Sequence, residues 1–451
     1  MIHRPAKRRS AAGVYMVSLG CPKNLVDSEV IAGLLITAGI PLNFDKNTAA
    51  YYLINTCAFL PSARQEACLA IEEGIRWKKQ APEQRKLIVA GCLIQQDKTR
   101  VIQQRYPEVD VWSRVDGVGN IINTLQNAHA GYTAGDAEEP VYLYDENTPR
   151  LQLTLPHVAY LKISDGCNNR CAYCSIPLIR GSLRSRSIAS VRQEAINLIA
   201  SGVRELILIA QDVTAYGHDR SDGATLAGLL HELDQLEGDF ILRLLYTHPA
   251  HYTDEFFAEY ARNRHLVPYL DIPLQHINDN ILMQMGRKAD RSRIETVLQK
   301  IRQARPESVI RTTFITGLPG EGEAEFAELE EFVKLQKFAR LGVFSYSPEP
   351  GTPAANRPDR ADLATAEARA EKLMQLQQGI SLQYNQALLG QTVRVICDQA
   401  EGRNAIGRTL GDAPEIDNTV YFSANRRLTP GEIYQVCITE VKTFDLYGKV
   451  C

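Results

Sequence analysis

Residues 166–174 run Gly-Cys-Asn-Asn-Arg-Cys-Ala-Tyr-Cys, and this short stretch carries the chain's sharpest chemical signal. Its three cysteines, Cys167, Cys171 and Cys174, are spaced C-x3-C-x2-C and follow an apolar, strand-length run at Tyr160–Ser164. Three thiolates on one loop can surround a metal ion or hold one face of an iron–sulfur cluster. Zinc sites usually take four ligands in paired Cys or His sets, and no fourth Cys or His follows nearby. The spacing therefore favours a 4Fe-4S cluster with one iron left open.

The region after this loop alternates between strand-like and helix-like patterns. Six stretches have the length and apolar content of buried strands: Tyr160–Ser164, Glu205–Ala210, Ile241–Tyr246, Tyr269–Ile272, Ile310–Ile315 and Gly342–Tyr346. Such alternation predicts parallel strands with helices packed against them. Six units predict a partial (β/α)6 barrel, because the closed form needs eight.

Polar side chains follow several of these predicted strands. The candidates for contact with a substrate or cofactor are Gln211, Asp212, Gln275 and His276. Barrel active sites are built at the carboxyl ends of the strands, where these residues would lie. A lone histidine such as His276 is more often a structural hydrogen-bonding group than a base. We therefore assign no catalytic residue beyond the cysteine loop.

The first part of the chain also alternates between strand and helix. Its predicted strands are Val14–Leu19, Tyr51–Ile54, Leu87–Ala90 and Val109–Trp112. This pattern predicts a doubly wound parallel-sheet domain of the α/β class.

Three cysteines of this first domain share one position in the pattern. Cys21, Cys57 and Cys92 each come just after the carboxyl end of a predicted strand. A single buried cysteine is usually a packing residue. Three in the same register are expected to converge at the sheet edge where open parallel sheets bind ligands. The sequence therefore predicts a second site with three thiol ligands.

From Gln391 onward the chain has short β-branched runs separated by Gly and Asp-Asn breaks, which predict a small antiparallel β-barrel. Cys397, Cys437 and Cys451 lie there without ligand spacing. We expect four segments: an N-terminal domain at 11–130, a linker at 131–152, a central domain at 153–389 and the end barrel at 390–451.

Composition excludes several classes of protein. The chain has 451 residues, 45% of them hydrophobic, and its 50 Lys and Arg against 53 Asp and Glu give a net charge of −3. No chain-wide basic charge is present to support nonspecific nucleic-acid binding. Ten cysteines are too sparse for a secreted disulfide scaffold. The longest apolar stretch, at 33–42, is about half the length of a membrane helix. We therefore expect a cytoplasmic protein without membrane attachment.

Placed after the first strand of a β/α barrel, the C-x3-C-x2-C loop resembles that of the radical S-adenosylmethionine (SAM) superfamily. The whole chain is similar to one branch, the methylthiotransferases. The segments that carry this resemblance are SLGCPKN (18–24), INTC (54–57), AGCL (90–93), GCNNRCAYCSIP (166–177), AQDVTAYG (210–217), IPLQH (272–276) and TGLPGE (316–321).

The resemblance implies two 4Fe-4S clusters and SAM as cofactors. It assigns the ligands of the first cluster to Cys21, Cys57 and Cys92, and those of the second, SAM-binding cluster to Cys167, Cys171 and Cys174. It places Tyr173 near the adenine of SAM and makes the end barrel a TRAM domain. It also implies a low-potential electron donor of the flavodoxin or ferredoxin type and a sulfur donor. We expect a monomer.

Two branches of the methylthiotransferases compete for this chain. One, of the MiaB type, modifies an adenosine of tRNA. The other, the RimO family, converts an aspartate of the small-subunit ribosomal protein S-twelve to 3-methylthioaspartate. The forms SLGCPKN followed by LVDSE, and Gly407-Arg408 followed by DAPEID (412–417), resemble the RimO family.

Charge also favours the RimO branch. Residues 391–451 hold seven Lys and Arg against eight Asp and Glu. A barrel that grips tRNA should be clearly basic, whereas a neutral to slightly acidic one suits a basic ribosomal protein. A more remote alternative is a noncatalytic iron–sulfur protein that only binds the ribosome.

Overall fold

The computed structural model describes residues 13–128, 132–134 and 139–451, and it divides into two compact units. The first unit comprises the chain up to Leu153 together with Ser175–Arg184, and the second comprises Thr154–Cys174 and Ser185–Cys451. The segment Ser175–Arg184 thus packs with the first unit, although it lies inside the range expected for the central domain. No helix among the described residues is long and apolar enough to cross a bilayer.

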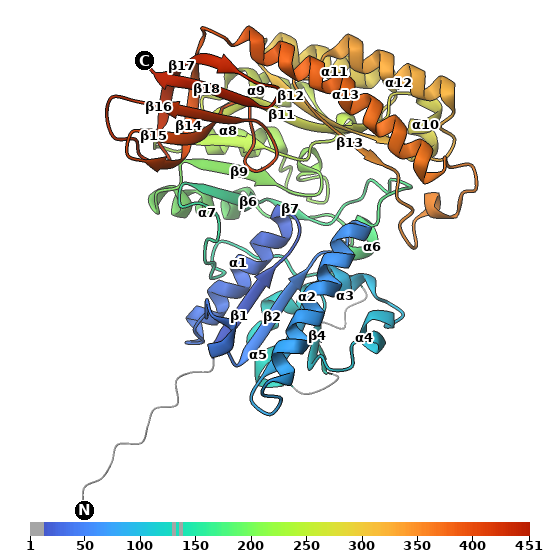
Figure 1. Cartoon of the computed structure of the whole chain (residues 1–451), viewed down its shortest axis with the longest axis vertical. Helices are drawn as coiled ribbons and strands as arrows, with labels where there is room; N and C mark the ends of the chain where they lie inside the picture. Colours follow the sequence, from blue (N-terminus) through green and yellow to red (C-terminus); the bar gives the residue numbers. More distant parts are fainter. Residues whose placement is uncertain (1–12, 129–131, 135–138) are drawn as a thin grey trace, which may run out of the picture. The chain divides into compact units, whose positions relative to one another are not determined.

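The first unit is built on a parallel sheet of five strands in the order β1-β2-β3-β4-β5. Figure 1 labels β1, β2 and β4 of this sheet. The strands are β1 (Val14–Ser18), β2 (Tyr51–Thr56), β3 (Lys86–Gly91), β4 (Val111–Ser113) and β5 (Tyr132–Ala134). The helices are α1 (Pro22–Thr37), α2 (Pro61–Lys79), α3 (Cys92–Gln96), α4 (Val101–Arg105), α5 (Ile121–Gln126) and α6 (Ile176–Arg180), with 3-10 turns η1 (Lys46–Thr48) and η2 (Val115–Asn120). Strand β5 lies in the expected linker, of which residues 131 and 135–138 are outside the described residues.

Helices cover both faces of this sheet. Tyr52 and Ile54 of β2 share a core with Ile71 of α2. Leu53, between them, is fully buried and points to the opposite face, because successive side chains of a strand alternate. Helices α1 and α5 contact each other and η2. The predicted doubly wound α/β domain is therefore confirmed.

The second unit contains an open parallel sheet of six strands in the order β13-β12-β11-β10-β9-β6, which confirms the predicted partial barrel. These strands are β6 (Val158–Lys162), β9 (Glu205–Ile209), β10 (Ile241–Leu244), β11 (Leu266–Gln275), β12 (Val309–Thr316) and β13 (Arg340–Ser345), and two short strands, β7 (Ser164–Asp165) and β8 (Arg184–Ser185), flank the cysteine loop in the sequence.

The crossover helices pack their apolar stripes on this sheet. They are α7 (Ile188–Ala200), α8 (Leu226–Asp234), α9 (Asp254–Arg262), α10 (Asp279–Gln284), α11 (Arg291–Ala304) and α12 (Glu323–Gln336), with 3-10 turns η3 (Val213–Ala215), η4 (Pro249–His251) and η5 (Pro353–Asn356). Helices α7–α11 each begin at a side-chain cap that accepts a backbone N–H: Ser187, Thr225, Thr253, Asn278 and Asp290. Such caps satisfy donors that the first helical turn leaves free.

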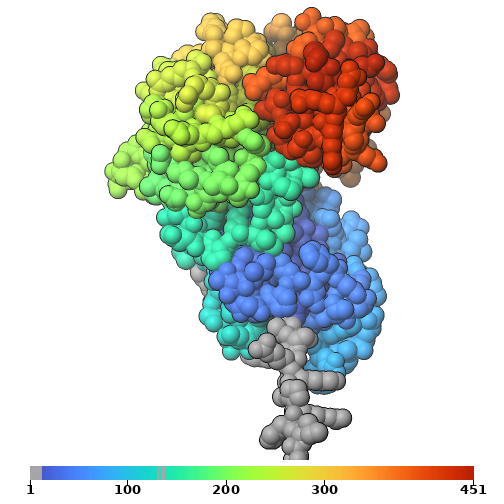
Figure 2. Space-filling model, turned by 90° about the vertical axis from the view of Figure 1, so that its left-hand side faces the viewer, coloured from blue at the N-terminus to red at the C-terminus, as the bar shows by residue number. Residues whose placement is uncertain are grey.

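The long helix α13 (Leu363–Ala387) leads into a closed barrel in the order β14-β15-β16-β18-β17. Its strands are β14 (Thr392–Glu401), β15 (Asn404–Thr409), β16 (Thr419–Ser423), β17 (Ile433–Val441) and β18 (Asp445–Val450). The predicted small barrel is confirmed, with one parallel pair, β16 and β18, among antiparallel neighbours. In Figure 2 the red end barrel lies directly against the yellow-green part of the same unit.

Buried ion pairs join the end barrel to the amino ends of the central strands. Arg408 on β15 pairs with Glu205, the first residue of β9, at 2.7 Å, and with Asp398 on β14 at 2.7 Å. Arg243 on β10 pairs with the same Glu205 and donates to the Leu410 carbonyl. Glu205 and Arg243 are fully buried. The end barrel therefore covers the sheet edge opposite the carboxyl ends.

The segment DAPEID (412–417) belongs to this junction. Asp412 pairs with Arg340, the first residue of β13, at 2.7 Å. Asp417 accepts a hydrogen bond from the Tyr269 hydroxyl on β11 at 2.7 Å and faces Arg311 on β12 at 3.5 Å. The sequence signature that favoured the RimO family thus fastens two parts of one unit together.

We predict that Arg408→Ala destabilises the second unit by about 3–5 kcal/mol, because it removes the partner of a buried Glu205 carboxylate. Arg394→Ala, an exposed change on β14, is the matched control and should cost less than about 0.5 kcal/mol. Urea unfolding measures both. Equal effects of the two substitutions would contradict the account.

The same pair predicts a pH dependence. Burial opposes ionisation of Glu205, but Arg408 and Arg243 hold its pKa below the ordinary value of 4.5. The stabilisation by Arg408 is therefore complete above pH 4.5 and is lost as the pH falls through the lowered pKa. Unfolding curves of wild type and Arg408→Ala should converge on acidification. A gap that widens toward low pH would refute this assignment.

Candidate functional site

The structure places Cys21, Cys57 and Cys92 at the carboxyl edge of the first sheet. Cys57 directly follows β2, Cys92 directly follows β3 and opens α3, and Cys21 lies at the start of α1. The residue before Cys21 is Gly20, with φ +89°, and a side chain there would lie 2.4 Å from Cβ of Cys57. Only glycine tolerates both this backbone conformation and this close approach. The Gly-Cys pair therefore lets Cys21 and Cys57 come together.

Gly91, before Cys92, has the same role. Its φ is +98°, and a Cβ atom there would lie 2.4 Å from Oδ1 of Asn55. The chain turns at this glycine, so Cys92 enters the edge that Cys57 also occupies. Charges on Cys21 and Cys57 act on the Cys92 thiol, which agrees with three thiols around a common point.

One buried cation faces this first trio. The Arg180 guanidinium on α6 donates to Sγ of Cys92 at 3.1 Å and pairs with Asp27 at 2.7 Å. Burial raises the pKa of the Cys57 thiol, and raises that of Cys92 to about 12 although Arg180 opposes this. Without a metal these thiols stay protonated, and metal binding has to displace their protons.

The second trio, Cys167, Cys171 and Cys174, lies on the loop after β6 and β7. Arg170 takes φ +52° within the loop, and the Cys174 N–H donates to the Cys171 carbonyl at 3.0 Å. The Ala172 N–H donates to the Met285 carbonyl at 2.8 Å, which anchors the loop on the end of α10. The backbone thus holds the loop in one turn.

Arg287 lies against this loop. Its Nη1 is 3.9 Å from Sγ of Cys171 and 3.3 Å from the Tyr173 hydroxyl, and Nη2 donates to the Pro273 carbonyl. Burial raises the pKa of Tyr173 well above its ordinary value, so its ring stays neutral. Tyr173 packs on the apolar cluster that contains Met285 and Leu318.

The spacing of the sulfurs fits a cluster better than a single ion. Within the described residues, neither trio has all three sulfurs within 4.8 Å of one another. Thiolates on one tetrahedral zinc at 2.3 Å lie about 3.8 Å apart. A cluster binds each thiolate through a different iron, so its ligands lie further apart. Both trios are therefore too widely spaced to hold one zinc ion as they stand.

Asp212, one of the predicted candidates for contact with substrate or cofactor, anchors the loop that carries Cys167, Cys171 and Cys174. Its Oδ2 accepts from Nδ2 of Asn169 at 2.6 Å and pairs with Nδ1 of His251 at 2.8 Å. Its Oδ1 accepts from Thr214 and the Ala215 N–H. Burial opposes its ionisation, but the hydrogen bonds from His251 and Thr214 lower the pKa of Asp212. Asp212 thus ties the barrel to Asn169, which lies between Cys167 and Cys171.

His248 lies beside this carboxylate, and its ring stacks on His251 at 5.1 Å. Ligand atoms of Asp212, His248 and His251 lie within 4.8 Å of one another. The carboxylate oxygens of Asp212 are already saturated, and Nδ1 of His248 accepts from the Ala250 N–H. Burial and Arg287 lower the pKa of His248, so the neutral ring carries its proton on Nε2. The trio is a hydrogen-bonded network rather than a metal site.

The other predicted residues lie in different surroundings. Gln211 donates to Oδ1 of Asp165 at 2.7 Å, beside the cysteine loop. Gln275 ends β11 with φ +73°, and its buried Oε1 has no partner among the described residues. His276 is fully buried, and its Nε2 lies 3.5 Å from Glu321, a contact within the fold.

Five residues that contact or surround the two trios were not predicted: Asn169, Arg180, His248, His251 and Arg287. A positional signal was present for one of them, because His248 follows the carboxyl end of β10 just as Asp212 follows that of β9. The two arginines had no signal, because they reach the cysteines from distant helices or loops.

Three family models match the chain in succession. They are the uncharacterized protein family UPF0004 at residues 13–113, the radical SAM superfamily at 161–333 and the TRAM domain at 389–451. The radical SAM match implies SAM and an iron–sulfur cluster, and the second trio lies within it.

Relatives match over nearly the whole chain. "Ribosomal protein uS12 methylthiotransferase RimO" of Desulforamulus reducens is 40% identical over 97% of this chain and 99% of its own length. The protein of the same name from Akkermansia muciniphila is 42% identical over 96% of this chain and 98% of its own length.

Solved structures share the fold at low identity. The radical SAM methyltransferase TsrM from Kitasatospora setae matches with a TM-score of 0.58 at 14% identity, covering 87% of this chain and 79% of its own. At that identity the match supports the architecture alone. Together the full-length relatives and the three successive family matches show that this chain belongs to the RimO family of radical SAM methylthiotransferases.

Proposed function

We propose that the chain attaches a methylthio group to the β-carbon of an aspartate in ribosomal protein uS12, giving 3-methylthioaspartate. The observation that carries this proposal is the pair of cysteine trios, each at the carboxyl edge of a parallel sheet. One trio suits a SAM-cleaving cluster, and the other suits a second 4Fe-4S cluster that carries the sulfur. The full-length relatives named for this activity support the same target.

The second trio would hold the cluster that binds SAM. A cluster with SAM bound would supply a 5'-deoxyadenosyl radical. Such a radical can remove a hydrogen from a carbon that no general base could deprotonate. Asn169 and Asp212 fix the cysteine loop, and Arg287 also contacts it. The neutral Tyr173 would pack near the adenine. The buried Nε2–H of His248 has no partner among the described residues and is free to donate to a bound ligand.

The first trio would hold the sulfur-carrying cluster. Cys174 is followed directly by Ser175–Arg184, a segment that belongs to the first unit. The chain thus runs without a spacer from one ligand set into the unit of the other. A second SAM would supply the methyl group, and a flavodoxin- or ferredoxin-type donor and a sulfur donor would complete the reaction of a monomeric enzyme.

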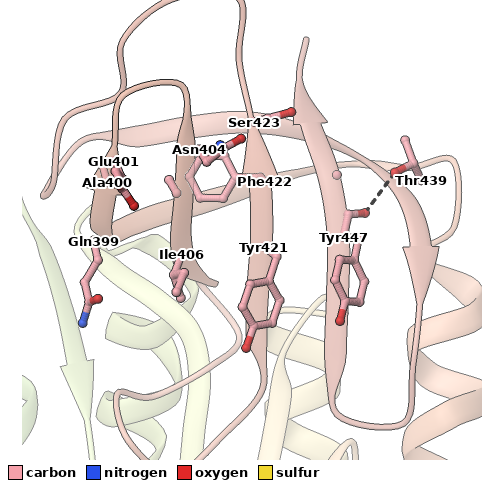
Figure 3. Close-up of a pocket in the computed structure, with 12 residues that line it drawn as sticks. Gln399, Ala400, Glu401, Asn404, Ile406, Tyr421, Phe422, Ser423, Thr439 and Tyr447 are labelled. Atoms are coloured by element: carbon pink, nitrogen blue, oxygen red, sulfur yellow. Dashed lines mark hydrogen bonds between the residues drawn. The ribbon is translucent and has the colours of Figure 1, made fainter.

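A groove on the end barrel bears on the choice between uS12 and tRNA. Tyr421 on β16 and Tyr447 on β18 lie side by side, with ring centroids 5.3 Å apart, and point the same way as Ile406 (Figure 3). The groove has a volume of about 510 Å³, and its lining includes Glu401 but no Lys or Arg. Lys442, outside this lining, donates to the Tyr447 hydroxyl at 2.9 Å. A run of RNA phosphates needs several cations, so the groove suits a basic protein segment better than RNA.

We predict that Cys167→Ala, after anaerobic reconstitution, keeps about four of about eight irons per chain and forms no 5'-deoxyadenosine. The reason is that this thiolate is one of three ligands that the SAM-binding cluster has. Iron analysis and chromatography of the nucleoside measure both quantities. Cys437→Ala, in the end barrel outside either trio, is the control. Nucleoside formation by the Cys167 variant at the control's rate would contradict the assignment.

The companion change, Cys57→Ala, separates the two clusters. It should leave 5'-deoxyadenosine formation in place and stop methylthio transfer, because only the sulfur-carrying site is damaged. Mass spectrometry of a uS12 peptide detects the product. Unchanged product would eliminate the carrier role of the first trio.

A deletion strain and a double variant of the groove test whether uS12 or tRNA is the substrate. We expect a deletion strain to lack the methylthio group on uS12 while its tRNA nucleosides are unchanged, as measured by mass spectrometry of both. The double variant Tyr421→Ala/Tyr447→Ala should raise the KM for uS12 roughly tenfold, the effect of about 1.4 kcal/mol of lost contact, with 5'-deoxyadenosine formation preserved. Loss of the tRNA modification instead would replace uS12 by tRNA as the substrate.

A further inference from the structure

Arg180 is the buried residue whose contacts the proposed reaction leaves unexplained. It is 2% exposed and lies on α6, in the segment Ser175–Arg184. Its Nη2 donates to Sγ of Cys92 at 3.1 Å and lies 3.3 Å from Oδ1 of Asn24, while Nη1 pairs with Asp27 at 2.7 Å. Its guanidinium is therefore held by two side chains in a fixed direction toward the sulfur.

We propose that Arg180 is a positioning residue that sets the reduction potential and the stability of the cluster on the first trio. This inference rests on the proposed first cluster. A one-electron reduction adds one negative charge to such a cluster. A neighbouring cation and an N–H···S hydrogen bond stabilise the reduced form more than the oxidised form, and hydrogen bonds to the sulfurs and net charge are established controls of cluster potential.

The geometry favours this role over a purely structural ion pair. A structural pair needs only Asp27, whereas Arg180 directs a second nitrogen at a cluster ligand. Arg287 gives an internal comparison, since its Nη1 lies 3.9 Å from Sγ of Cys171. The interaction at the first trio is shorter, so we expect the stronger effect there.

The test uses the full chain with Cys167, Cys171 and Cys174 all replaced by Ala, so that only the first cluster can form. Arg180→Gln removes the charge, Arg180→Lys keeps it, and Arg76→Gln, an exposed change on α2, is the matched control. Each variant is reconstituted anaerobically with iron and sulfide. Its midpoint potential is measured by EPR during titration with dithionite, and iron loss to a chelator is timed.

We expect the ratio of reduced to oxidised cluster at a fixed potential to fall about tenfold in Arg180→Gln, a negative shift of about 59 mV for one electron. Iron loss should be roughly tenfold faster, and Arg180→Lys should lie between this variant and the control. If Arg180→Gln retains no iron, a negative shift in Arg180→Lys supports the proposal.

A midpoint potential equal to that of the control in both variants would overturn the role of Arg180. Faster iron loss would also count against it if the metal-free variant showed a lowered melting temperature that accounts for the loss. If the triple cysteine background itself binds no iron, the proposed first cluster fails instead. The two failures are therefore distinguishable.

Discussion

The convergence of parallel strands at a common carboxyl edge is the constraint on which both cysteine trios depend. Cys21, Cys57 and Cys92 are spread over 72 positions of the sequence, yet each follows a strand of one sheet, so the fold delivers all three thiols to one place. The second trio lies on the loop after β6 and β7 in the second unit, so all three of its thiols come from one short stretch of sequence. In both cases an arginine faces the sulfurs, buried at the first trio and half-buried at the second.

The carboxyl and amino ends of the central strands carry different groups of functional and structural residues. The carboxyl ends carry the cysteine loop, Asp212 and His248, whereas the amino ends carry Glu205 and Arg340, which hold the end barrel through buried ion pairs with Arg408 and Asp412. A buried ion pair gives little net stability compared with apolar packing, but breaking one is costly. Such pairs specify how the end barrel is fastened without using the edge that carries the cysteine loop.

The sequence allowed much of this to be predicted, for identifiable physical reasons. Apolar runs of strand length revealed the central strands. The position of Cys21, Cys57 and Cys92 just after such runs predicted the first trio, and the C-x3-C-x2-C spacing predicted the second. Contacts between distant positions could not be predicted. Arg180 reaches Cys92 across 88 residues and Asp212 reaches His251 across 39, and no local pattern records such pairs.

Two local features of the fold were also missed. Strand β5 has three residues and adds to the first sheet through pairing with β4, so its identity comes from the partner strand rather than from its own composition. The parallel pairing of β16 with β18 closes the end barrel, and closure is a property of the whole sheet. The segment DAPEID was predicted as a family signature, but its ion pairs emerged only from the structure.

Diffraction at the iron absorption edge from crystals grown without oxygen tests the central claim most directly. The account predicts two compact iron peaks of four atoms each, one bound by Cys21, Cys57 and Cys92 and the other by Cys167, Cys171 and Cys174. Iron on a single trio, or a single iron atom at either trio, would contradict it.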